Sequence, residues 1–147
     1  MPVEITDWHV DLLRTYLRQD DAKLRPMARM IGAKDELDGS GVLMWAAFVE
    51  ACHRRFTRKT GADIVRFVAH ARIRRGRNAP PIAPGAAEKL IISALAGTRA
   101  EGLTELQRAQ HIILLSELIE DAAPTEAELE QFLTAARTYA ERLAATV

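Results

Sequence analysis

The chain has 147 residues and a net charge of zero, from 20 lysine and arginine residues against 20 aspartate and glutamate residues. This length suits one folded domain with its own core, and the 48% of hydrophobic residues is ordinary for a globular protein. A single cysteine excludes an internal disulfide framework and a cysteine-based zinc finger. We therefore expect one domain over residues 1–147 in the reducing environment of the cytoplasm.

Apolar residues recur with helical spacing along the chain, and no alternation of β-branched residues lasts long enough for a strand. A first helix is expected from Thr6 or Asp7 to about residue 20. A short second helix, 26–31, should begin near Pro26, because proline suits a first turn better than a helix interior. The glycine-containing segment 38–41 predicts a loop in which Ser40 caps a third helix, 41–58.

Beyond the third helix, the chain contains two capping patterns in which a threonine is followed three residues later by an acid. Thr60 with Asp63 predicts a fourth helix, 62–75, whose inward face carries Ile64, Phe67, Val68 and Ala71. Pro84 begins a fifth helix that ends at Gly97, and Thr125 with Glu128 begins a last helix.

A sixth helix, 104–121, is apolar in nearly every direction around Ile112–Leu115. A helix of this kind is buried by its own domain or by a partner chain, so a homodimer is a further expectation. The chain as a whole predicts an all-α fold, a compact single-domain bundle of about six to seven helices with a central buried helix at 104–121. No uncharged run approaches the roughly 18 residues that cross a bilayer, and the start lacks the pattern of a signal peptide, so we expect no membrane contact.

The residue patterns predict no catalytic, cofactor-binding or metal-binding residue, and we expect no enzyme activity. A calcium loop over 36–47 would place Ala47 where a bidentate glutamate is needed. Glu50 and His53 have the Glu-x-x-His spacing of di-iron bundles, but the chain has no second copy. Cys52 and His53 diverge by about 100° on a helix and cannot act together as nucleophile and base.

The acidic end of the sixth helix leaves two interpretations open. Glu117, Glu120 and Asp121 lie near the negative pole of that helix, where acidic residues are mildly unfavourable. They form either a carboxylate site or a solvated helix end, and the second interpretation is favoured because clusters of charge are usually solvated.

Charge is distributed unevenly, with nine arginine and lysine residues and one acidic residue in 53–77. We predict a non-catalytic interaction or regulatory module that binds an acidic protein partner through a basic surface at 54–77, with Ile73 as an apolar anchor. The alternative is a DNA-binding protein that uses helices 41–58 and 62–75 as a helix-turn-helix-like unit. A third interpretation is that the arginines pair with acidic C-terminal helices of the same chain. The candidate binding residues are Arg54, Arg55, Arg58, Lys59, Arg66, His70, Ile73, Arg74 and Arg77.

Overall fold

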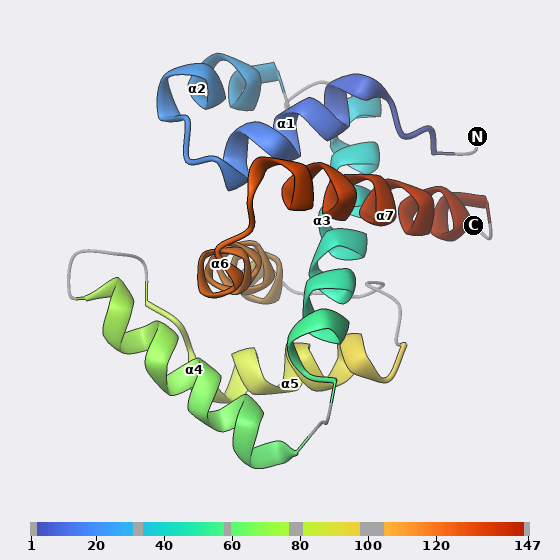
Figure 1. The fold of residues 1–147 in the computed structure, drawn as a ribbon. Helices are drawn as coiled ribbons and strands as arrows, with labels where there is room; N and C mark the ends of the chain where they lie inside the picture. Colours follow the sequence, from blue (N-terminus) through green and yellow to red (C-terminus); the bar gives the residue numbers. More distant parts are fainter. Residues whose placement is uncertain (1–2, 31–33, 58–59, 77–80, 98–104, 146–147) are drawn as a thin grey trace. The chain divides into compact units, whose positions relative to one another are not determined.

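The computed structural model of the chain describes residues 3–30, 34–57, 60–76, 81–97 and 105–145. These residues form seven α-helices and no strand (Figure 1), which confirms the predicted all-α class. The helices are α1 (Asp7–Leu17), α2 (Asp21–Met30), α3 (Lys34–Arg55), α4 (Gly61–Arg75), α5 (Pro84–Leu95), α6 (Glu105–Ala122) and α7 (Glu126–Ala145).

Backbone contacts divide the chain into two units, and the boundary falls inside α3. The first unit is Met1–Glu50 with Ala123–Val147, and the second is Ala51–Ala122. A single domain over residues 1–147 therefore stays a prediction. The whole basic stretch 54–77 belongs to the second unit, together with the acidic end of α6.

In the first unit, α1 and α7 contact each other and each buries one apolar face (Figure 1). Apolar spacing of three and four residues is what directs one face of a helix into a core. In the same unit α3 adds a tilted pair of rings, Trp45 and Phe48, whose centroids are 5.6 Å apart. The buried apolar residues at these spacings on α1 and α7 are Leu12, Leu13, Leu17, Leu129, Phe132, Leu133, Ala136 and Ala140.

The predicted start of the second helix was wrong, because α2 begins at Asp21 and holds Pro26 inside it. Asp20 starts the helix early: its carboxylate accepts a hydrogen bond from the Lys23 backbone N–H at 3.3 Å, and its carbonyl accepts one from Leu24 at 2.9 Å. Pro26 removes one bond from the helical ladder. The carbonyl left over belongs to Ala22, which is exposed, so water can satisfy it.

The loop predicted at 38–41 was also wrong, because α3 begins at Lys34 and continues through these residues. Ser40 therefore lies inside a helix and is buried, instead of capping one. A Cβ atom at Gly39 would lie 2.7 Å from Nε2 of His9 and 2.9 Å from the carbonyl oxygen of Glu4. Glycine at this position serves a close approach between segments instead of a turn. The third helix also ends earlier than predicted, at Arg55.

In the second unit, α5 contacts both α4 and α6. The rings of Phe56 and Phe67 meet edge to face, with centroids 5.6 Å apart. The buried side-chain amide of Gln110 on α6 accepts a hydrogen bond from the Ala83 backbone N–H at 2.9 Å and donates one to the Pro81 carbonyl at 3.1 Å. This amide satisfies the backbone of the segment that leads into α5, where no helical partner is available.

Burial of α6 is as predicted from its apolar sequence. Every residue from Gln110 to Ile119 is buried or half-buried, and Leu114 and Leu115 are fully buried. Ile112 and Ile113 are half-buried. The apolar segment that motivated the expectation of a homodimer is therefore largely covered.

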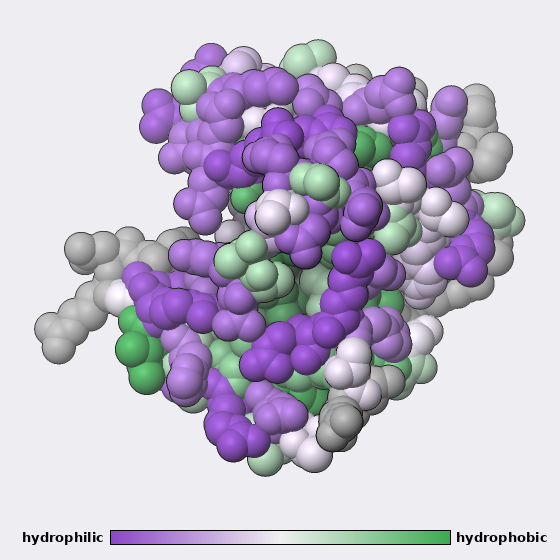
Figure 2. All heavy atoms as spheres, in the orientation of Figure 1, coloured by the Kyte–Doolittle hydropathy of each residue, from purple (hydrophilic) through white to green (hydrophobic). Residues whose placement is uncertain are grey.

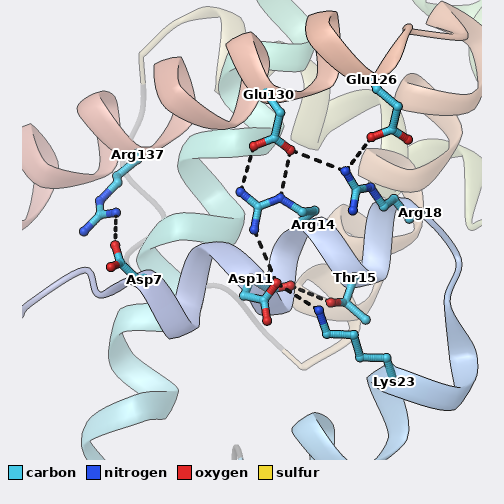
Figure 3. A network of polar contacts seen from close by, with 9 residues as sticks. All are labelled: Asp7, Asp11, Arg14, Thr15, Arg18, Lys23, Glu126, Glu130 and Arg137. Atoms are coloured by element: carbon cyan, nitrogen blue, oxygen red, sulfur yellow. Dashed lines mark hydrogen bonds and ion pairs between the residues drawn. The ribbon is translucent and has the colours of Figure 1, made fainter.

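A network of ion pairs connects α1 with α7 (Figure 3). Arg14 donates from Nε and from a terminal nitrogen to the two oxygens of Glu130, both at 2.8 Å, and Arg18 pairs with Glu126. A separate pair, Arg137 with Asp7 at 2.6 Å, joins the same two helices. The hydrogen bonds from Arg14 hold the pKa of the Glu130 carboxyl below its ordinary value.

Replacing Gly39 with alanine should lower the free energy of unfolding by about 1–3 kcal/mol, because the new methyl group overpacks the contact with His9. The matched control is Gly41→Ala in the same helix, where a Cβ meets nothing within 4 Å. This control should raise stability by about 0.5–1 kcal/mol, since alanine favours a helix over glycine. Urea denaturation measures both changes, and equal effects of the two substitutions would contradict the close approach at Gly39.

Replacing Glu130 with glutamine should lower stability at pH 7 by less than about 1 kcal/mol, because the ion pair with Arg14 is half-exposed. A carboxyl whose folded pKa is lowered stabilises the fold above its unfolded pKa of about 4.3 and loses that contribution as the pH falls through the folded value. The wild type and the variant should therefore converge near pH 2, as followed by thermal denaturation across pH. Glu141→Gln, at an exposed ion pair of 3.6 Å, is the control with little effect. A loss of equal size at both pH values would show that the charge of Glu130 is unimportant.

Candidate interaction surface on α4

The local sequence fixes both ends of α4. The Thr60 hydroxyl accepts a hydrogen bond from the Asp63 backbone N–H at 3.2 Å, which confirms the predicted cap. The helix ends before Gly76, whose φ of 70° lies in the region that glycine adopts without strain. Three arginines in the last turn, at 72, 74 and 75, are favourable beside the negative pole of the helix.

The inner face of α4 is the apolar face predicted from the sequence. Ile64, Phe67, Val68 and Ala71 are all buried. Because their spacing of three and four residues selects one side of the helix, their burial also determines which residues of α4 point outward.

The carboxylate of Glu117 on α6 is buried and binds two arginines of α4. Its Oε2 accepts hydrogen bonds from Nε and a terminal nitrogen of Arg74, at 3.2 and 2.9 Å, and its Oε1 accepts one from Arg75 at 3.4 Å. Glu117 is 4% exposed, so its charge requires partners of this kind. These bonds attach the C-terminal turn of α4 to α6.

Asp121, one helical turn beyond Glu117, extends the same cluster. Its two oxygens pair with Arg55 at 2.9 Å and with Arg74 at 3.4 Å. The Arg55 guanidinium also lies over the rings of Phe56 and Phe67, at 5.2 and 5.7 Å from their centroids. Arg55 and Arg74 therefore stabilise the fold by binding carboxylates of α6.

The pKa of the Arg74 guanidinium depends on its partial burial and on the neighbouring carboxylates of Glu117 and Asp121. Partial burial acts to lower the pKa of its guanidinium, but the hydrogen bonds to Glu117 and the charges of Glu117 and Asp121 outweigh it and raise that pKa above its ordinary value. The same bonds explain why α6 ends in acidic residues next to its own negative pole. A solvated helix end, as favoured from the sequence, is wrong for Glu117 and fits the exposed Glu120.

The nine residues predicted as a binding surface separate into four groups. Arg66, His70 and Ile73 are exposed on the outer face of α4, and Ile73 is 79% exposed. Arg55 and Arg74 bind the carboxylates of α6, and Arg54 is exposed at the end of α3. The rest lie outside the described residues: Arg58, Lys59 and Arg77. The structure therefore reduces the described part of the candidate surface on α4 to three residues.

Sequence reasoning missed two neighbours of this group. Val65 is 51% exposed on α4, and Arg72 is exposed on the same helix. The signal was available, because Val65 lies four residues before Ala69 and eight before Ile73 and therefore shares their face. In Figure 2 a green patch at the left edge lies over α4 beside purple, charged neighbours. We call Val65, Arg66, Ala69, His70, Arg72 and Ile73 the outer face of α4.

The described residues give little support to a cysteine nucleophile or a metal site. Burial raises the pKa of the Cys52 thiol well above its usual range, and His53 beside it in the sequence is exposed. In the described part of the chain, no three His, Cys, Asp or Glu side chains gather where they could hold a metal ion. None of the seven described helices has both the length and the apolar composition that a bilayer crossing requires.

Comparison with known proteins adds no functional assignment. No protein-family model matches the chain, and no curated protein and no solved structure is significantly similar to it. The candidate surface therefore depends on the geometry and charge of the residues themselves.

Replacing Glu117 with glutamine should lower the free energy of unfolding by about 1.5–3 kcal/mol, the range for hydrogen bonds to charged groups. The glutamine keeps the shape of the side chain but leaves Arg74 and Arg75 without their buried counter-charge. Glu120→Gln is the matched control on the same helix, and its exposed side chain predicts a change within about 0.5 kcal/mol. Urea denaturation of both variants tests this, and equal stabilities would contradict a structural role for Glu117.

Proposed function

We propose that the chain is a non-catalytic α-helical interaction or regulatory module that binds an acidic protein surface through the outer face of α4. The observation that carries the proposal is Ile73, a large aliphatic side chain that is 79% exposed, with the exposed arginines Arg66 and Arg72 and the exposed His70 on the same helix. Protein interfaces combine an apolar anchor with arginine in this way. The proposed surface is smaller than the basic stretch 54–77, since Arg55 and Arg74 bind carboxylates of the same chain.

The non-catalytic part of the proposal is supported by the state of the single cysteine. A thiolate is the nucleophilic form, and the buried Cys52 with its raised pKa stays protonated at neutral pH. A location in the cytoplasm belongs to the same proposal, since a lone buried thiol suits a reducing compartment.

DNA binding through the ends of α3 and α4 is the alternative function. The exposed Arg54 and Arg66 favour it, because arginines of a helix pair contact phosphates and base edges. Two contacts weigh against it. Asp63 in the first turn of α4 binds Arg66 at 2.9 Å and places a negative charge where a recognition helix meets the duplex, and Arg55 is held by Asp121. The exposed aliphatic side chain of Ile73 finds no apolar partner on a phosphate backbone, so a protein partner is the better supported proposal.

Replacing Arg66, His70 and Ile73 together with alanine should abolish binding of acidic partners and leave circular dichroism unchanged, because all three side chains are exposed. Immobilised wild-type chain should retain proteins of low isoelectric point that raised salt releases. Retention by the triple variant should fall by at least about tenfold, since each interface anchor contributes about 2 kcal/mol or more.

The matched control removes two arginines and an exposed aliphatic side chain from α2, by Arg25→Ala, Arg29→Ala and Met30→Ala. This variant should retain the same partners as the wild type. Equal retention by the wild type and the α4 variant would overturn the proposal. Binding of a DNA duplex at about 50 mM salt, with affinity that falls steeply as salt rises and is lost in the α4 variant, would replace it with the alternative.

A further inference from the structure

The outer face of α4, together with Ala62 one turn before it, carries an apolar stripe that includes the anchor Ile73. Ala62, Val65, Ala69 and Ile73 are all exposed, at successive spacings of three, four and four residues. At about 100° per residue these side chains fall within an arc of about 80°. The opposite face of the same helix is the buried one, so α4 is apolar on two sides.

Arginine side chains border this stripe on both edges. Arg72 follows one edge, and Arg66 and His70 follow the other, from the angular position of each residue on the helix. All three are exposed, and the Arg66 side chain keeps 69% exposure beside Asp63. An occupant of the stripe therefore meets positive charge along both of its sides.

We infer that the outer face of α4 binds an amphipathic helix of a partner protein, whose aliphatic stripe is bordered by glutamate or aspartate. This inference rests on the proposed function and specifies its partner. From Ala62 to Ile73 the exposed stripe spans twelve residues, about 16 Å or three helical turns, which a helix of about 11–14 residues matches. The small Ala69 lies near its centre, where it allows a second helix to approach closely.

Charge complementarity decides between this partner and a second copy of the chain. Pairing α4 with itself brings the arginines that border one stripe against those of the other, and like charges across an interface cost several kcal/mol. A partner with acidic borders turns the same positions into attractive pairs. Addition of a strand requires an open sheet edge, and the described residues form no sheet.

The test uses three synthetic peptides of 21 residues, a length chosen as roughly three heptads. The first has leucine at positions a and d and glutamate at e and g, the second has lysine at e and g, and the third is a scramble of the first without a leucine stripe. Fluorescence anisotropy with the full chain should give at least about tenfold tighter binding for the first peptide than for the other two. Raised salt should weaken that binding.

Two variants of the protein locate the binding site. Val65→Ser with Ile73→Ser should lose binding of the first peptide, whereas Ile92→Ser should keep it, because Ile92 is 55% exposed on α5 and lies outside the stripe. Circular dichroism confirms that both variants fold. Equal binding of the lysine peptide or of the scramble, or equal loss in the Ile92 variant, would overturn the inference.

The outcomes separate this inference from the proposed function. If the first peptide fails to bind while acidic proteins are still lost from the alanine variant of α4, the helical partner is wrong and the proposed function stands. If the first peptide fails to bind and the alanine variant of α4 still retains acidic proteins, both the inference and the proposed function are wrong. A dimer in light scattering that the Val65 and Ile73 substitutions dissociate would replace the partner helix with a second copy.

Discussion

The buried carboxylate of Glu117 is the constraint on which the candidate surface depends. A carboxylate taken out of water must be compensated by charge and hydrogen bonds, and Arg74 and Arg75 provide both. These bonds fix the rotation of α4 about its axis at its C-terminal turn, and the buried Ile64, Phe67, Val68 and Ala71 fix it along the rest. The outward direction of Val65 and Ile73 is therefore a consequence of how the inner face is held.

Ion pairing within each unit removes much of the charge asymmetry that the sequence suggests. The acidic residues of α7 are bound by α1, since Arg14 and Arg18 pair with Glu130 and Glu126. The arginines of α4 find their partners on α6 instead. The interpretation that arginines of 54–77 meet acidic helices of the same chain is thus correct for Arg55, Arg74 and Arg75. The helix that binds them is α6.

Sequence patterns of three or four residues predicted some parts of this fold correctly and other parts wrongly. The caps at Thr60 and Thr125 and the inner face of α4 follow from residues three or four apart, and the structure confirms them. The start of α2 depends on Asp20, a cap that competes with the preference of Pro26 for a first turn. Gly39 was misassigned because its close contact is with His9, thirty residues earlier in the chain. The pairing of Arg55, Arg74 and Arg75 depends likewise on Glu117 and Asp121, which are 42 to 66 residues away.

Exposed arginines alone give a surface little selectivity, because any polyanion is attracted to them and salt screens the attraction. The aliphatic stripe allows the outer face of α4 to distinguish partners with apolar surface from simple polyanions. Burial of Val65 and Ile73 stabilises a complex only when the partner also presents apolar area, which a phosphate backbone lacks. The bordering cations then select among apolar partners by charge and speed their encounter. A surface with both features favours acidic amphipathic proteins over nucleic acid and over basic proteins.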